Sequence, residues 1–184
     1  MGETDSQKSV GDNYLEEARS RFRYYRWLTE RALEQVDDRT FFATRGESNP
    51  IAVIVKHLAG NMLSRFSDFG SSDGEKPDRN RDAEFELYRK DTRQELEMRL
   101  QQGWDLVEST VDGLRADDLT RVVHIRSQQH SILEALNRQL THYAYHVGQI
   151  VFIARQAGGR RWESLSIPRG QSDSFNASMA RQEG

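Results

Sequence analysis

Residues 131–157 read SILEALNRQLTHYAYHVGQIVFIARQA, and this stretch decides the fold. Ser131 followed three residues later by Glu134 is a capping-box pattern, which predicts that a helix begins here. The apolar residues that follow recur at steps of three and four, as in an amphipathic helix. Gly158 and Gly159 form a typical stop signal. We therefore expect a long final helix that ends at these two glycines.

Three earlier stretches carry the same helical periodicity. Ser48 or Asn49 is the expected cap of the second of these helices, with Pro50 in its first turn. The first contains the arginine-rich sequence RSRFRYYR at residues 19–26, which we interpret as a solvated face rather than as a patch for an anionic ligand. The three expected helices run over residues 14–36, 48–70 and 85–114.

The connecting segments differ from the helices in composition. Residues 37–46 read as a polar turn and residues 70–82 as a polar loop. Residues 119–125, LTRVVHI, alternate weakly and indicate a short extended or hairpin-like connection. The residues after Gly159 lack a helical period, so we expect an irregular C-terminal tail lying over the helices. The chain is thus predicted to be all-α, a four-helix bundle with a short extended connection before its last helix.

Length and composition indicate how the chain is organised. A length of 184 residues, 36% hydrophobic and 30% charged, fits one domain whose amphipathic helices bury a narrow core. Residues 1–12 are polar and acidic, and we expect a disordered lead-in there. The domain, including its tail, is expected over residues 13–176, with a flexible end over residues 177–184.

Charge and cysteine content exclude several classes of function. The net charge of −3, with both signs mixed along the chain, argues against a nucleic-acid partner. The absence of cysteine excludes disulfides and thiolate ligands. No run approaches the roughly 18 apolar residues that span a bilayer. Residues 1–12 also lack the features of a secretory signal. We therefore expect no membrane partner and a cytoplasmic location.

A histidine pair lies in the expected final helix. His142 and His146 are four residues apart, so both imidazoles project from one helix face. Gln139 and Gln149 continue this polar stripe along the edge of the apolar stripe. Polar groups at the edge of a core need partners, and a bound cation would satisfy the imidazoles and both amides. The pair is therefore a candidate metal site, with Gln139 and Gln149 as residues supporting it.

A third histidine lies in the expected second helix. His57 shares a face with Asn61, and that face should look into the bundle. One histidine opposite a histidine pair is how a bundle builds a three-nitrogen site. We predict one divalent metal ion on His57, His142 and His146, with Asn61 as a further supporting residue. Three protein ligands leave coordination positions open, as in catalytic metal sites. Imidazole suits Zn, Ni, Fe or Cu and does not choose among them.

The other histidines and the acidic residues provide weaker evidence for a functional site. His124 and His130 lie in the connection before the final helix, and we interpret both as surface residues. Among the polar groups near the histidine pair only Glu134 can titrate. No separate general base is evident, so the catalytic residues remain unassigned.

With these histidine motifs the chain resembles the DinB-like, YfiT-related superfamily. The matching motifs are Ser48 leading to His57-Leu58, HYAYHVGQI at residues 142–150, and the ending SIPRGQS at residues 166–172 with Phe175-Asn176. The ending is similar to that of an uncharacterised subgroup. The resemblance covers roughly residues 14–176. It implies a four-helix bundle with one metal-binding histidine in its second helix and an H-x-x-x-H pair in its fourth.

The resemblance also implies a function. Relatives suggest a metal-dependent thiol S-transferase or isomerase that acts on a small molecule with a low-molecular-weight thiol such as bacillithiol, mycothiol or glutathione. A metal-dependent hydrolase using metal-bound water is an alternative reading of the same site. A third reading is a non-enzymatic, stress-linked binding protein in which the metal is structural.

The expected final helix is apolar on nearly every side, which predicts a partner. Beyond the core and histidine stripes it carries Ala144, Tyr145, Gly148 and Phe152. A helix exposed on one side should not look like this. Either the C-terminal tail or a second copy of the chain covers that face, and we expect a homodimer, as relatives in the superfamily often form.

Overall fold

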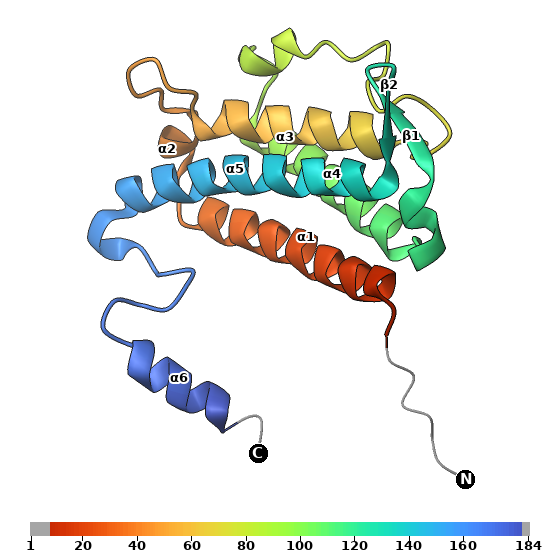
Figure 1. The fold of residues 1–184 in the computed structure, drawn as a ribbon. Coiled ribbons are helices and arrows are strands. Elements are labelled where there is room, and N and C mark those ends of the chain that lie inside the picture. The colour runs from red at the N-terminus through yellow and green to blue at the C-terminus, as the bar shows by residue number, and fades with distance from the viewer. Residues whose placement is uncertain (1–7, 182–184) are drawn as a thin grey trace.

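Residues 8–181 are described by a computed structural model, and they are mostly helical, as predicted (Figure 1). The α-helices found in them are α1 (Val10–Glu34), α2 (Asp38–Phe42), α3 (Ile51–Phe66), α4 (Arg93–Asp112), α5 (Ile132–Gly158) and α6 (Ser172–Ala180). The 3-10 helices are η1 (Asp82–Phe85), η2 (Ala116–Thr120) and η3 (Gly159–Arg161), and the strands are β1 (Val122–Ile125) and β2 (Gln128–Ser131). None of the helices described is long and apolar enough to cross a membrane.

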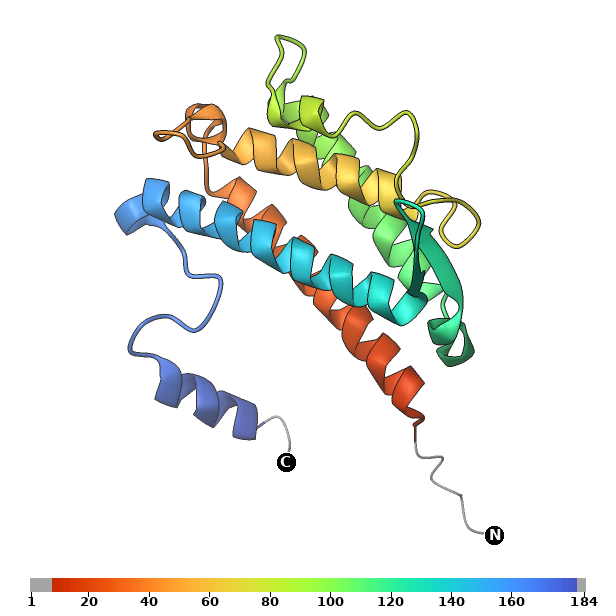
Figure 2. The same cartoon turned by 45° about the horizontal axis from the view of Figure 1, so that its top comes forward.

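The four longest helices enclose the core. Helix α3 packs along α4 and α1 along α5, while α1 also contacts α4 and α3 also contacts α5. Figure 1 shows α5 between α3 and α1 with α4 behind, and Figure 2 shows the same neighbours from another side. Helices α1, α4 and α5 each contribute one buried apolar stripe, whereas most of α3 is buried.

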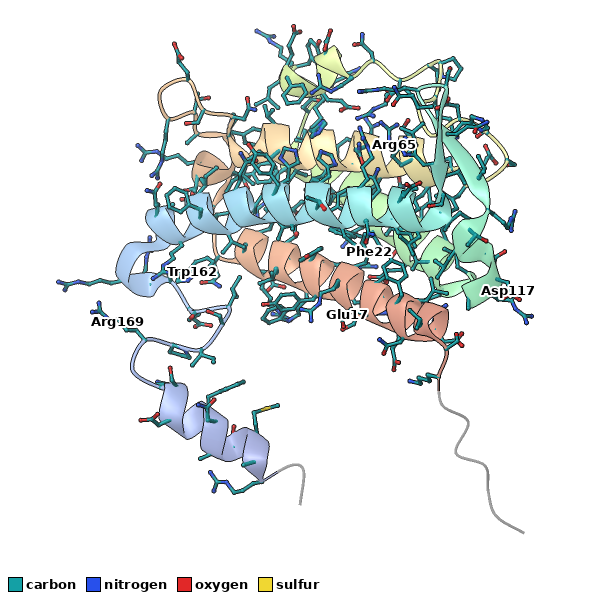
Figure 3. The ribbon with its side chains drawn as sticks, viewed as in Figure 1. Glu17, Phe22, Arg65, Asp117, Trp162 and Arg169 are labelled. Atoms are coloured by element: carbon teal, nitrogen blue, oxygen red, sulfur yellow. The ribbon has the colours of Figure 1, made fainter. Side chains whose placement is uncertain are left out.

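Aromatic side chains fill the centre of the core. The Tyr143 ring lies edge-on to Phe22 at 6.0 Å and to Trp104 at 5.5 Å between centroids, an arrangement that aromatic rings favour. Figure 3 shows Phe22 between α1 and α5. Gly103 lets α4 approach α3 closely, because a Cβ atom there would lie 2.9 Å from the Cβ of Met62.

The start and end of α5 confirm the sequence prediction. The Ser131 hydroxyl accepts a hydrogen bond from the backbone N–H of Glu134 at 3.2 Å, and the Glu134 carboxylate accepts from the backbone N–H of Ser131 at 2.7 Å. These bonds satisfy two backbone donors that the first turn would leave unpaired. Gly159 ends the helix with φ +53°, in the left-handed region that glycine tolerates.

The extended connection is a β-hairpin that is tied to the loop after α3. Strands β1 and β2 pair antiparallel through a turn in which Arg126 and Ser127 both have positive φ, at 55° and 61°. The Asp73 carboxylate accepts hydrogen bonds from the backbone N–H groups of both residues, at 2.9 and 2.7 Å. Asp73 therefore holds the hairpin tip against the 70–82 loop.

The first helix begins earlier than expected. Although the sequence suggests a lead-in over residues 1–12, α1 already begins at Val10. The reason is local, since the Ser9 side chain accepts a hydrogen bond from the backbone N–H of Asp12 at 3.1 Å. Residues 1–7 of the expected lead-in lie outside the described residues.

The predicted cap of α3 is wrong. Pro50 occupies the cap position, and neither Ser48 nor Asn49 does. The Ser48 hydroxyl instead donates to the carbonyl of Arg45 and closes a turn before the helix. Helix α2 lies within residues 37–46, which we expected to be only a polar turn. The Asp37 side chain caps this one-turn helix.

The predicted start of α4 is also wrong. This helix begins at Arg93 rather than near residue 85, because the Thr92 side chain accepts a hydrogen bond from the backbone N–H of Glu95 at 3.2 Å. The residues before it form η1 and a turn instead.

The C-terminal tail is only partly as expected. Trp162 and Leu165 pack against the core, but the chain then forms helix α6, which buries no side chain and lies apart from the long helices (Figures 1 and 2). The prediction of an irregular tail missed α6, since Phe175 and Met179 alone make too short an apolar stripe to reveal it. Residues 182–184 of the expected flexible end lie outside the described residues.

Candidate metal centre

Three histidines from two helices converge beside the core. His57 comes from α3, and His142 and His146 come from successive turns of α5. Each offers one ring nitrogen, and these atoms lie within 4.8 Å of one another. The Nε2 atoms of His57 and His142 are 3.2 Å apart. Within residues 8–181 this is the one group of three or more such side chains that could hold a metal ion.

A buried carboxylate orients His57. The Nδ1 atom of His57 donates to Oε2 of Glu84 at 2.8 Å, in a contact buried from solvent. The guanidinium of Arg79 holds the same carboxylate through two hydrogen bonds, at 2.8 and 2.9 Å. Burial opposes ionisation of Glu84, but the hydrogen bonds from His57 and Arg79 outweigh it and lower the pKa of the carboxyl group. Glu84 therefore stays a carboxylate that positions the ring.

Gln149 does the same for His146. Its Oε1 atom accepts from Nδ1 of His146 at 2.8 Å. Carboxylate and amide oxygens only accept hydrogen bonds, so Nδ1 of both His57 and His146 must donate. The Nε2 atoms of those two rings then keep lone pairs for a metal ion. Carboxylate and amide partners of this kind are usual for histidine ligands.

The environment keeps the α5 histidines neutral. Burial, followed by the positive charges of the neighbouring histidines and of Arg65 and Arg79, lowers the pKa of His142 to about 3. Burial also lowers the pKa of His146. A metal ligand must be an unprotonated imidazole, so these shifts prepare the site for a cation. The donor set thus fits one divalent ion at bonds of about 2.0 to 2.2 Å, with small side-chain adjustments.

A glycine makes room for the Glu84 carboxylate. Gly60 lies on α3 one turn after His57, and a Cβ atom there would be 2.2 Å from Oε1 of Glu84. No side chain fits in that space while Glu84 holds His57. The sequence offered no signal for this pairing, because Glu84 lies in the short 3-10 helix η1, which is too short to show a periodicity that would place it.

The other predicted supporting residues lie at the edge of the site. A cavity of about 170 Å³ opens on His57 and His142, and Asn61 and Gln139 line it. The Asn61 side chain accepts a hydrogen bond from the Tyr143 hydroxyl at 3.2 Å. Gln139 is buried, and its Oε1 atom has no hydrogen-bond partner among the described residues. Neither amide bonds a histidine, in contrast to Gln149.

The remaining candidates lie elsewhere. His124 and His130 belong to the hairpin strands and do not join the group. Glu134 is committed to the cap of α5, where the backbone N–H of Ser131 lowers its pKa. A larger hollow, about 600 Å³, lies against Lys56, Glu84 and the loop after α3, and it touches none of the three histidines. Among the described residues, the candidate metal ligands therefore lie together at the histidine group, and a cavity of about 170 Å³ opens on two of them.

Comparisons with other proteins place the chain in a family. No curated protein and no solved structure matches it. Residues 9–171 match a family described as "Protein of unknown function (DUF1572)", a span that covers α1 to α5 and all three histidines. The chain belongs to this family.

Proposed function

We propose that this chain is a DinB-like four-helix-bundle metalloprotein that binds one divalent ion through His57, His142 and His146. The observation that carries the proposal is the convergence of three imidazoles, two of which are fixed by acceptors on their far nitrogens. Ligand type leaves Zn, Ni, Fe and Cu as candidates. A structural zinc site would have four protein ligands, and this group has three among the described residues.

We further propose that the centre is catalytic and of the thiol S-transferase or isomerase type. A divalent ion at this position would supply Lewis acidity, which favours the thiolate form of a bound low-molecular-weight thiol. The residues of this chain position the centre: Glu84 fixes the His57 ring, Gln149 fixes the His146 ring, and Arg79 keeps Glu84 ionised. A cytoplasmic location, where such thiols stay reduced, fits the proposal.

Metal analysis tests the binding site. The purified protein should contain about one equivalent of a divalent metal, and His146→Ala should lose it while keeping its helical circular dichroism, because apolar burial supplies most of the stability. His124→Gln, which changes an exposed histidine of the hairpin, is the matched control and should bind metal normally. Metal content that is the same in wild type and His146→Ala would contradict the proposed ligands.

A second experiment separates the catalytic readings. The metal-loaded protein is assayed with glutathione, bacillithiol and mycothiol against a set of electrophiles, and with ester and amide substrates in the absence of thiol. Thiol-dependent turnover that His146→Ala abolishes supports the transferase. Turnover of esters or amides without thiol would contradict the transferase and support a metal-dependent hydrolase instead. A loaded but inactive protein that unfolds when chelated would favour the structural-metal reading.

A further inference from the structure

Arginines gather at the cavity beside the candidate metal centre. The cavity of about 170 Å³ that opens on His57 and His142 has no carboxylate among its lining side chains. Its volume corresponds to about five or six water molecules, enough for a carboxylate or phosphate group. The lining arginines are Arg65, Arg79, Arg81, Arg126 and Arg138.

Separate segments of the chain bring these arginines together. Arg65 lies on α3, Arg79 and Arg81 in the loop before η1, Arg126 at the hairpin tip and Arg138 on α5. Figure 3 places Arg65 on α3, toward the end of the helix where the loop and the hairpin come together. On α5, Arg138 stands one helical turn before His142, on the same face. The cavity therefore lies along the face of α5 that carries His142.

Nearby carboxylates neutralise only part of this charge. Glu75 accepts hydrogen bonds from Arg65 at 2.8 Å and Arg126 at 3.1 Å, and it also pairs with Arg79 at 3.4 Å. One carboxylate thus serves three guanidinium groups, with Glu84 as a second partner of Arg79. The centre behind the cavity consists of imidazoles and would gain further positive charge with a metal ion.

The remaining two arginines of the cavity, Arg81 and Arg138, have even fewer acidic partners. Arg81 has one ion pair, at 3.7 Å, with a side chain of Asp82 that is 97% exposed. The side chain of Arg138, in contrast, makes no hydrogen bond or ion pair with another described residue. An exposed pair such as Arg81–Asp82 is weak. The lining of the cavity therefore carries a net positive charge.

One buried donor in the lining lacks a partner. Arg65 is 5% exposed, and its Nε atom has no hydrogen-bond partner among the described residues. An unpaired buried donor costs free energy, and a ligand or a water molecule in the cavity would remove that cost by accepting a hydrogen bond from it. Guanidinium groups present paired donors that match the two oxygens of a carboxylate or phosphate.

We propose that this arginine cavity binds an oxyanion group of the substrate, a carboxylate or a phosphate, while the reacting group of the same molecule reaches the histidine centre. The inference rests on the proposed function for the position of the reacting group. The inference restricts the thiol cosubstrate to thiols that carry carboxylate or phosphate groups. Glutathione, with its two carboxylates, is one of these, and thiols without such groups are disfavoured.

A ligand pair that differs only in charge tests the cavity. S-Methylglutathione has both carboxylates and no free thiol, so its binding reports on the cavity rather than on thiolate coordination. Its diethyl ester has the same skeleton without the carboxylate charges. Calorimetry on the metal-loaded protein should show binding of the acid, at least tenfold weaker binding of the ester, and competition by inorganic phosphate if the cavity also accepts that oxyanion.

Matched arginine variants locate the binding. Arg138→Gln should weaken binding of the acid about tenfold and leave the ester unchanged, because a hydrogen bond to a charged group is lost. Arg155→Gln changes an exposed arginine near the other end of α5 and should have no effect. Equal binding of acid and ester, or no effect of Arg138→Gln, would overturn the inference.

Metal content measured on the same samples separates the two proposals. Full metal loading together with equal binding of acid and ester would remove the oxyanion inference and leave the metal site standing. Charge-dependent binding that Arg138→Gln weakens, in a protein whose wild type binds no divalent metal, would support the cavity and remove the proposed function.

Discussion

At the residue scale, the candidate metal centre depends on the small residue Gly60 and the charged residue Glu84. Glu84 reaches His57 because Gly60 has no side chain to stop it. The sequence predicted the three histidines from their helical spacing, and Gln149 for the same reason. It could not predict Glu84, since the contact spans 27 residues and Glu84 lies in a 3-10 helix of four residues, too short to show a periodicity. Local spacing therefore reveals ligands on helices but not the groups that orient them from loops.

Replacing Gly60 by Ala tests this pairing. A Cβ atom at 2.2 Å from Oε1 must displace the carboxylate, and His57 then loses its acceptor. We expect zinc affinity, measured against a competing chelator, to fall about 10- to 100-fold. Helical content should hold, because Ala is the better helix former. Gly148→Ala, where a Cβ meets nothing within 4 Å, is the control and should bind like wild type. Undiminished affinity in Gly60→Ala would remove Glu84 from the site.

The half-buried imidazole of His142 predicts how the metal-free protein responds to acid. Its pKa is about 3 in the folded chain and about 6.5 when unfolded, so the unfolded chain binds more protons between these values. Acidification therefore favours unfolding, and stability should decrease as pH falls through 6.5 toward 3. His146 contributes in the same direction.

Urea denaturation of the metal-free protein at pH 7 and pH 5 measures this dependence. We expect lower stability at pH 5, with a smaller loss in His142→Asn, since the substituted side chain does not titrate. His124→Asn, at an exposed position on the hairpin, should keep the wild-type dependence. A pH dependence that His142→Asn leaves unchanged would place its origin in other groups.

At the scale of elements, both ends of α5 were predictable, because a capping box marks its start and two glycines mark its end. Ser131 and Glu134 gave the start of α5 correctly. For α4, Phe85 and Tyr88 continue the helical spacing, but the chain bends before Thr92. There the Asp91 carboxylate accepts a hydrogen bond from the backbone N–H of Tyr88 at 2.7 Å. Periodicity alone could not reveal this local competition.

The cap of α5 should make a measurable contribution to stability. Ser131→Ala removes the acceptor for the backbone N–H of Glu134, and we expect the free energy of unfolding to fall by about 1 kcal/mol. Thr141→Ala is the matched control within the same helix. Its hydroxyl bonds back to the carbonyl of Asn137 at 2.8 Å, and Ala should leave stability equal or slightly higher. Chemical denaturation measures the free energy of unfolding of both variants. An equal loss in Ser131→Ala and Thr141→Ala would show that removal of a hydroxyl group, and not of the cap, causes the effect.

At the scale of the whole molecule, the arginine cavity shows what only the assembled fold can reveal. The sequence drew attention to the arginines of residues 19–26, but several of these pair with acidic side chains of α1 and α4, such as Arg23 with Asp112 and Arg26 with Glu108. The arginines of the cavity are scattered over residues 65–138 and share no pattern. Tertiary structure alone brings them beside the histidines.

The outer face of α5 remains uncovered in the single chain. Tyr145 and Phe152 are 64% and 61% exposed, and they lie seven residues apart on one side of the helix. Gly148 lies between them with open space above it. The tail packs Trp162 and Leu165 against the core but does not cover these aromatic side chains.

We therefore propose that a second copy of the chain covers this face in a two-fold dimer. Exposed aromatic residues around small ones suit an interface, because the rings bury a large area while the small residues allow close approach. Phe152→Glu places a charge within that contact, so sedimentation velocity should show a dimer for wild type and a monomer for this variant. Met98→Glu, at an exposed apolar position on α4, is the control and should stay dimeric. Both variants should keep their metal, since the histidines lie on another face of α5. A monomeric wild type would refute the dimer, and a dimeric Phe152→Glu would place its interface elsewhere.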